Sequence, residues 1–140
     1  MPALKTYDLF ISHAWQYNVE YYKLVDMLNK ANNFKWRNYS VPEHDPAVDP
    51  DTEVGKNKLV AILKNQIRPV NCVLVLSGMY VSYHYWIQKE IDIASEYNKP
   101  IVGIKPWGQQ KVPTAVQNVA KTMVGWNTDS IIKAIREYSI

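Results

Sequence analysis

A single acidic residue, Glu90, interrupts the apolar face of a predicted helix and is the residue of this sequence best placed to do chemistry. At about 100° per residue, an arc of about 160° on that helix is apolar or aromatic apart from Glu90. Its other members are Ile93, Trp86, Tyr97, Ala94, Ile87 and Ile91. An ionised carboxylate is costly to bury without a partner. Glu90 is therefore expected to pair with a nearby hydroxyl or Lys, to be protonated, or to face a cleft where a ligand supplies the partner.

The other polar side chains are weaker indications of a functional site. His13, His44 and His84 stand at unrelated spacings, so no zinc or other metal site is expected. The acidic segment 44–51 suits a cation or the basic patch of a partner, or it is simply a solvated loop. No Gly-x-Gly-x-x-Gly or phosphate-loop pattern occurs, which disfavours dinucleotide reduction and ATP hydrolysis.

The bulk composition predicts one globular domain covering residues 1–140. The chain is 47% hydrophobic and 21% charged, and its net charge of +3 comes from Lys and Arg that are spread along its length. That spread gives little support to nucleic-acid binding, and we expect none.

Cysteine usage and the apolar runs indicate the compartment. The single cysteine, Cys72, lies in the apolar run 70–76, which predicts a buried, reduced thiol rather than a nucleophile. A lone cysteine suggests a reducing compartment. The start of the chain, residues 1–6, has no apolar leader, and no apolar stretch reaches membrane length. A cytoplasmic protein that does not bind membranes is expected.

Strand-like and helix-like segments alternate along the chain. The predicted strands are Tyr7–Ser12, Phe34–Ser40, Cys72–Leu76, Ile101–Ile104 and Met123–Gly125. The predicted helices are about Val19–Lys30, Lys56–Arg68, the segment that contains Glu90, Thr114–Ala120 and about Asp129–Tyr138. This alternation predicts an α/β fold of three layers, with a five-stranded parallel sheet and helices on both faces. Right-handed crossovers favour the strand order 2-1-3-4-5, as in flavodoxin-like domains.

In such a sheet the ligand crevice lies beyond the carboxyl ends of strands 1 and 3. The residues placed there are the candidate substrate-binding residues: Ser12 and His13 after strand 1, Ser77 after strand 3, and Tyr83 and Trp86 before Glu90. Alternatives remain for several of them. Ser12 binds a ligand or only satisfies its own turn. Trp86 walls the pocket or packs in the core. Tyr83, with Tyr80 and Tyr85, lines the crevice or bridges the sheet and the helix.

The sequence resembles TIR domains, and more narrowly the divergent TIR-like group that includes the sensor subunit of the bacterial Thoeris anti-phage system. Three features carry the resemblance: the strand 7–12 that ends in Ser, followed by a short polar turn; Trp86-x-x-x-Glu90; and the Pro-led strand 99–104. The sequence differs from the usual pattern of TIR domains at two places. The loop after strand 2 is unlike that of receptor-type domains, and His13-Ala14-Trp15 replaces the more usual acidic start.

The resemblance implies an enzyme that takes NAD as its substrate and needs no cofactor. Enzymatic TIR domains cleave the nicotinamide–ribose bond, and some then cyclise the ADP-ribose. By resemblance Glu90 would be catalytic, because a carboxylate stabilises the oxocarbenium-like ribose that forms when neutral nicotinamide leaves. Trp86 would stack on a flat ring, and Ser12 would hold ribose or phosphate oxygens.

Several partners are expected from the same resemblance. A cyclic ADP-ribose type signal would address a separate effector protein in phage defence, and self-association or TIR–TIR assembly would complete the sites. A non-catalytic interaction module is the main alternative, with Glu90 in a structural role. A receiver-like regulatory domain fits the same fold class, but such a domain would have acidic residues where Ser12-His13 and Ser77-Gly78 stand in this sequence.

Overall fold

Five parallel strands form the centre of the molecule. The computed structural model describes residues 5–12, 19–40, 52–105 and 111–140. The strands are β1 (Thr6–Ser12), β2 (Lys35–Asn38), β3 (Cys72–Leu76), β4 (Ile101–Ile104) and β5 (Thr122–Val124). Their order is β2-β1-β3-β4-β5, and every pair of neighbours is parallel. The predicted fold class and strand order are therefore confirmed.

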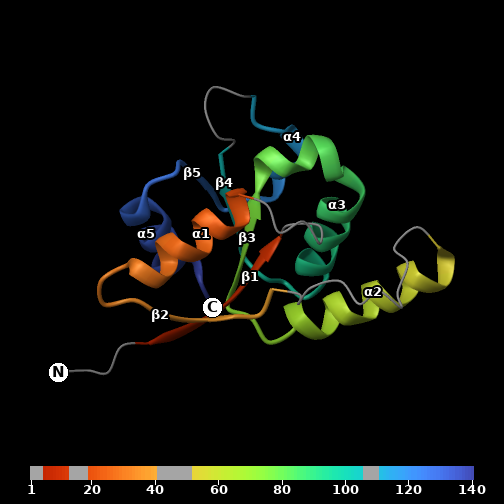
Figure 1. Ribbon diagram of the computed structural model, residues 1–140, viewed down its shortest axis with the longest axis horizontal. Helices are drawn as coiled ribbons and strands as arrows, with labels where there is room; N and C mark the ends of the chain where they lie inside the picture. The colour runs from red at the N-terminus through yellow and green to blue at the C-terminus, as the bar shows by residue number, and fades with distance from the viewer. Residues whose placement is uncertain (1–4, 13–18, 41–51, 106–110) are drawn as a thin grey trace.

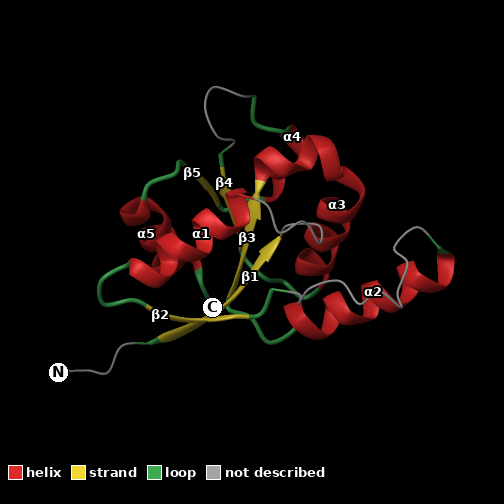
Figure 2. Ribbon diagram, viewed as in Figure 1, coloured by secondary structure: helices red, strands yellow, loops and turns green. Residues whose placement is uncertain are grey.

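Helices cover both faces of this sheet, as Figures 1 and 2 show. They are α1 (Val19–Lys30), α2 (Glu53–Ile67), α3 (Tyr80–Glu96), α4 (Thr114–Val119) and α5 (Thr128–Tyr138), with a short 3-10 turn, η1 (Ser77–Met79), between β3 and α3. α1 packs against α5 on one side, and α2 packs against α3 on the other. No described helix is long and apolar enough to cross a membrane.

One helix, α2, begins earlier than the sequence predicts. α2 starts at Glu53 rather than Lys56, because the Thr52 hydroxyl accepts a hydrogen bond of 3.0 Å from the Gly55 amide and so caps the first turn. α3 starts at Tyr80, directly after η1, so the tyrosines before Trp86 belong to the helix itself. The start of α2 was obscured by polar residues and Gly, which resemble loop residues in a sequence.

The side chains of β1 alternate between the two faces of the sheet. Tyr7 stacks on Phe34 with ring centroids 5.4 Å apart, and Arg136 of α5 lies over the Phe34 ring. Asn38, the β2 partner of Leu9, donates a hydrogen bond of 3.0 Å to the Tyr21 hydroxyl of α1. The odd-numbered residues of β1 therefore face α1 and α5. Its even-numbered residues, which end with Ser12, face the side covered by α2 and α3.

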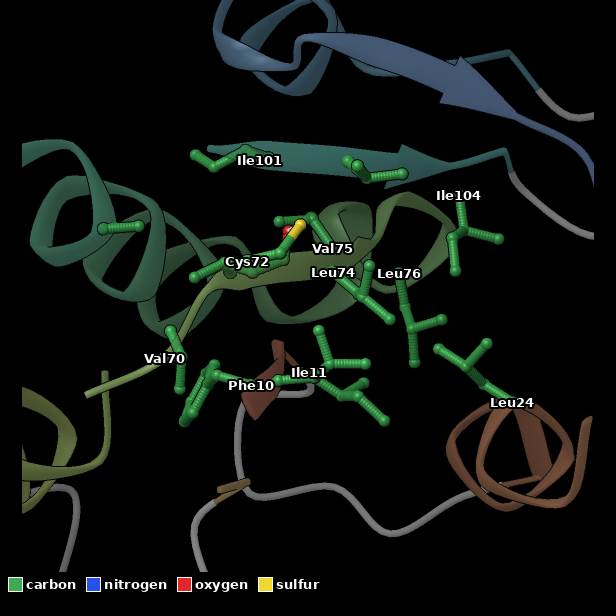
Figure 3. Close-up of a cluster of buried hydrophobic side chains, with 14 of the residues drawn as sticks. Phe10, Ile11, Leu24, Val70, Cys72, Leu74, Val75, Leu76, Ile101 and Ile104 are labelled. Carbon is green, nitrogen blue, oxygen red and sulfur yellow. Dashed lines mark hydrogen bonds between the residues drawn. The ribbon is translucent and has the colours of Figure 1, made fainter. Parts of the chain in front are cut away.

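The core lies on both sides of β3, whose five residues are all buried. Figure 3 shows Leu24 of α1 pointing toward Leu76 and Ile104, the last residues of β3 and β4. α3 packs against β1 and β3 from the opposite side. The helices are thereby anchored to the same strands whose carboxyl ends form the predicted ligand edge.

Cys72 should be unreactive in the folded protein. The thiol is fully buried, as predicted, and burial raises its pKa to about 12, so little thiolate exists at mildly alkaline pH. We expect an aromatic disulfide reagent to label Cys72 slowly in the native protein and within seconds to minutes after denaturation, followed by absorbance. Rapid stoichiometric labelling of native protein would contradict this assignment.

Candidate functional site

Glu90 lies on the buried face of α3, as the helical pattern predicts. Its side chain is 2% exposed, and its neighbours Ile87 and Ile91 are fully buried. Asp92 and Glu96, on the other side of the same helix, are exposed. Because α3 packs against β1 and β3, the carboxyl group is turned toward the sheet rather than toward solvent.

Ser12 is the last residue of β1 and is buried completely. It lies beside Val75 of β3, and strand alternation places it on the face that α3 covers. Its hydroxyl oxygen has no hydrogen-bond partner among the residues that the structure describes. A buried hydroxyl in this state costs free energy unless something else supplies the partner. Ser12 and Glu90 thus place two buried polar groups on the same face of the sheet.

Ser77 is equally buried, but its hydroxyl has a structural task. It donates a hydrogen bond of 2.5 Å to the Ile104 carbonyl, at the end of β4. This bond holds the exit of β3 to the exit of β4. Ser12 and Ser77 look alike in the sequence, because each stands at the end of a predicted strand. In the folded chain only the Ser77 hydroxyl has a hydrogen-bond partner among the described residues.

Trp86 lies one helical turn before Glu90 and is half-buried against the core. Its ring meets that of Tyr85 edge to face, with centroids 5.2 Å apart. Trp86 therefore packs against the core, which was one of its two predicted roles. Its role in ligand binding stays a prediction. Tyr83 belongs to α3, but its side chain lies outside the described residues, and so does His13.

Tyr80 and Tyr85, near the start of α3, line a pocket on the outer side of this helix. The Tyr80 hydroxyl donates to Gln88 at 2.6 Å, and Gln88 donates to Asp92 at 2.9 Å, along the outer side of the helix. A shallow pocket of about 260 Å³ is lined there by Tyr80, His84, Tyr85, Gln88, Lys89 and Asp92. This surface faces away from the buried side of α3 that carries Glu90.

One acidic residue was missed by sequence reasoning. Glu20, in the first turn of α1, has a carboxyl oxygen, Oε2, that is buried and has no hydrogen-bond partner among the described residues. Burial raises the pKa of this carboxyl group. The sequence offers no signal for it, because an acid in a first helical turn is ordinary.

Other hollows and clusters lie away from Glu90. A groove of about 720 Å³ between α1 and α5 is bordered by charged side chains, including Lys30, Asp129 and Arg136. It lies on the side of the sheet opposite to α3. Within the described ranges, no three His, Cys, Asp or Glu residues are grouped so that they could hold a metal ion.

Most of the chain matches a known family. The family described as Thoeris protein ThsB, TIR-like domain, matches residues 10–111, which is well over half of the 140 residues. The matched segment includes Ser12, Ser77, Trp86 and Glu90. No curated protein matches the chain.

Proposed function

Because the chain belongs to the TIR-like domain family of the Thoeris protein ThsB, we propose that it cleaves the nicotinamide–ribose bond of NAD and makes a cyclic ADP-ribose type signal. The signal would act on a separate effector protein in anti-phage defence. The observation that carries this proposal is Glu90, a carboxyl group 2% exposed on the face of α3 that packs against β1 and β3. A buried acid at this place, four residues after a half-buried Trp86, suits a reacting centre.

Cleavage of the nicotinamide–ribose bond requires one ionised carboxylate. When the C1′–N bond breaks, its electron pair goes to the nicotinamide nitrogen, which becomes neutral, and positive charge develops on the ribose. The Glu90 carboxylate stabilises that charge, and shielding from water strengthens the attraction. Either water or another atom of the same ADP-ribose then adds at C1′ and loses its proton, which yields the linear or the cyclic product.

The neighbouring groups have supporting roles in this proposal. The Ser12 hydroxyl can form a hydrogen bond with an oxygen of the ribose. Such a bond would give the Ser12 hydroxyl oxygen the partner that it lacks among the described residues. Trp86 offers a flat ring one turn from the carboxylate, suited to stack on nicotinamide. Neither role requires a cofactor.

The deciding experiment is incubation of the concentrated full chain with NAD, followed by liquid chromatography and mass spectrometry. Nicotinamide release is expected, together with a mass equal to ADP-ribose for hydrolysis or one water less for cyclisation. Since TIR enzymes often need assembly, the assay is repeated with lysate of phage-infected cells as a source of trigger. No turnover in either condition would contradict the proposal.

Exposed apolar side chains on α2 and α3 favour a second candidate, a TIR-like interaction module. Val54 is 66% exposed and Tyr85 is 45% exposed. The Lys56 ammonium lies 5.0 Å from the Tyr85 ring centroid, so the start of α2 and the start of α3 form one surface. In this interpretation Glu90 is structural, and self-association persists in the absence of NAD turnover.

Ser12→Ala and Ser77→Ala form a matched pair that separates ligand binding from folding. Ser12→Ala should lower NAD turnover about tenfold, the value of one hydrogen bond, and leave the thermal midpoint unchanged or higher. Ser77→Ala removes the donor to Ile104 and should cost about 1 kcal/mol of stability. Initial rates and thermal melts measure both. A Ser12→Ala variant with a lower midpoint and full turnover would contradict the ligand role.

A further inference from the structure

The carboxyl end of β1 is supported unequally by the two strands beside it. On one side β3 pairs with β1 as far as Ser12, which lies opposite Val75. On the other side β2 pairs with β1 only as far as Leu9, which lies opposite Asn38. The strand ladder between β1 and β2 therefore ends before it reaches Ser12, whose hydroxyl has a ligand role in the proposed function.

A side chain continues this ladder where the strand pairing of β2 ends. The Leu9 carbonyl accepts a hydrogen bond of 2.8 Å from the Tyr39 amide. The next amide on that side of β1 belongs to Ile11, because the main-chain groups of alternate residues point toward the same neighbouring strand. The Ile11 amide donates a hydrogen bond of 3.0 Å to the Ser40 hydroxyl oxygen. Ser40 thus holds β1 one residue before Ser12.

Ser40 is itself fixed by a hydrogen-bonded link to α1. Its amide donates to Asn38 Oδ1 at 2.8 Å, the turn in which an Asn side chain binds the main chain two residues on. The same Asn38 side chain donates from Nδ2 to the Tyr21 hydroxyl at 3.0 Å. Tyr21 is only 6% exposed. The Asn38 amide group is therefore held at both its donor and its acceptor, and a chain of hydrogen bonds runs from buried Tyr21 to Ile11.

The position of the Ser12 hydroxyl matters because a hydrogen bond weakens steeply as its angle and length depart from the optimum. A strand end held from one side only would let this hydroxyl move relative to a bound ribose. We propose that Ser40 is a positioning residue for Ser12, which it holds through Ile11, and that Asn38 and Tyr21 fix Ser40. This inference rests on the proposed NAD-cleaving function and on the ligand role of Ser12 within it.

The test removes the Ser40 hydroxyl and then restores it. Ser40→Ala should lower kcat/KM for NAD about three- to tenfold, the effect of one weakened hydrogen bond. Ser40→Thr keeps a hydroxyl and should retain the parental kcat/KM. In a Ser12→Ala background, Ser40→Ala should cause no further loss, because the group that Ser40 positions is already absent. Steady-state rates of nicotinamide release measure all of these variants.

Asn71 provides the matched control at the opposite end of the same strand. Its Oδ1 accepts a hydrogen bond of 2.8 Å from the Asp8 amide, so it too binds the main chain of β1 through a side chain. It also donates from Nδ2 to the Ile140 carbonyl at 2.9 Å. Asn71→Ala should therefore lower the thermal midpoint at least as much as Ser40→Ala does, yet leave kcat/KM at the parental value.

Three results would overturn the assignment and leave the proposed function standing. They are a parental kcat/KM in Ser40→Ala, an equal loss of kcat/KM in Asn71→Ala, and a loss in the Ser12→Ala background as large as in the parent. If the parent chain cleaves no NAD, the proposed function fails, and calorimetric titration with ADP-ribose decides. Weaker binding in Ser40→Ala, with parental binding in Ser40→Thr and Asn71→Ala, then supports the positioning role. Equal affinity in all variants, or no binding by the parent, overturns it.

Discussion

Replacing Glu90 with Gln is expected to lower nicotinamide release by at least about a hundredfold, since a comparable loss follows removal of one preorganised electrostatic group from an active site. Gln has nearly the same shape but no charge, so it cannot stabilise the developing positive charge on the ribose. Gln also fills nearly the same buried space, since Glu90 is only 2% exposed. The thermal midpoint of the variant should therefore stay close to that of the parent. Timed chromatography of nicotinamide and thermal melts measure the two effects.

The same helix provides the control. Glu96 belongs to α3 but lies on its exposed side, so Glu96→Gln removes an identical charge without touching the site. This variant should retain parental turnover. If Glu90→Gln were as active as Glu96→Gln, the catalytic assignment would be wrong, and the interaction module would become the better interpretation. Survival of self-association in the inactive variant would show that assembly and turnover are separable.

Much of the fold could be predicted because its signals are local and periodic. The apolar run of β3 predicted a buried strand, and its five residues are buried. The helical spacing around Glu90 predicted which side of α3 packs, and Ile87 and Ile91 lie there with it. The parallel strand order followed from chain connectivity alone. These inferences need only the distance along the chain and the preference of apolar side chains for the interior.

The roles of individual polar side chains needed the folded structure, because they depend on residues far away in the sequence. Ser12 and Ser77 both end strands, yet only Ser77 is bonded to Ile104, 27 residues away. Glu20 is an ordinary first-turn acid until the packing of α1 buries its Oε2 atom. The predictions for His13, for the acidic segment 44–51 and for the side chain of Tyr83 concern residues outside the described part of the chain and stay predictions.

Gly103→Val should destabilise the fold more than any of the serine or glutamate substitutions above. Gly103 lies in β4 beside Val75 and Met123, in the same row across the sheet as Ser12. A Cβ atom at this position would overlap Met123 Sδ and lie 3.2 Å from Val116 Cγ1 of α4. Overpacking of this kind costs about 1–3 kcal/mol, or a midpoint roughly 3–10 °C lower. Thermal and denaturant unfolding would measure the loss.

The size of the effect depends on whether Met123 can give way. Its thioether is flexible, so Gly103→Ala should cost less than Gly103→Val, whose added methyl groups also meet the stiffer Val116 of α4. Met123→Ala should recover part of the loss, which a double-mutant cycle would detect as a coupling between the two positions. Because β4 also supplies the Ile104 carbonyl that holds Ser77, a displaced β4 should lower turnover together with stability. A Gly103→Val protein as stable as the parent, with no coupling to Met123, would contradict this packing of β4 against β5 and α4.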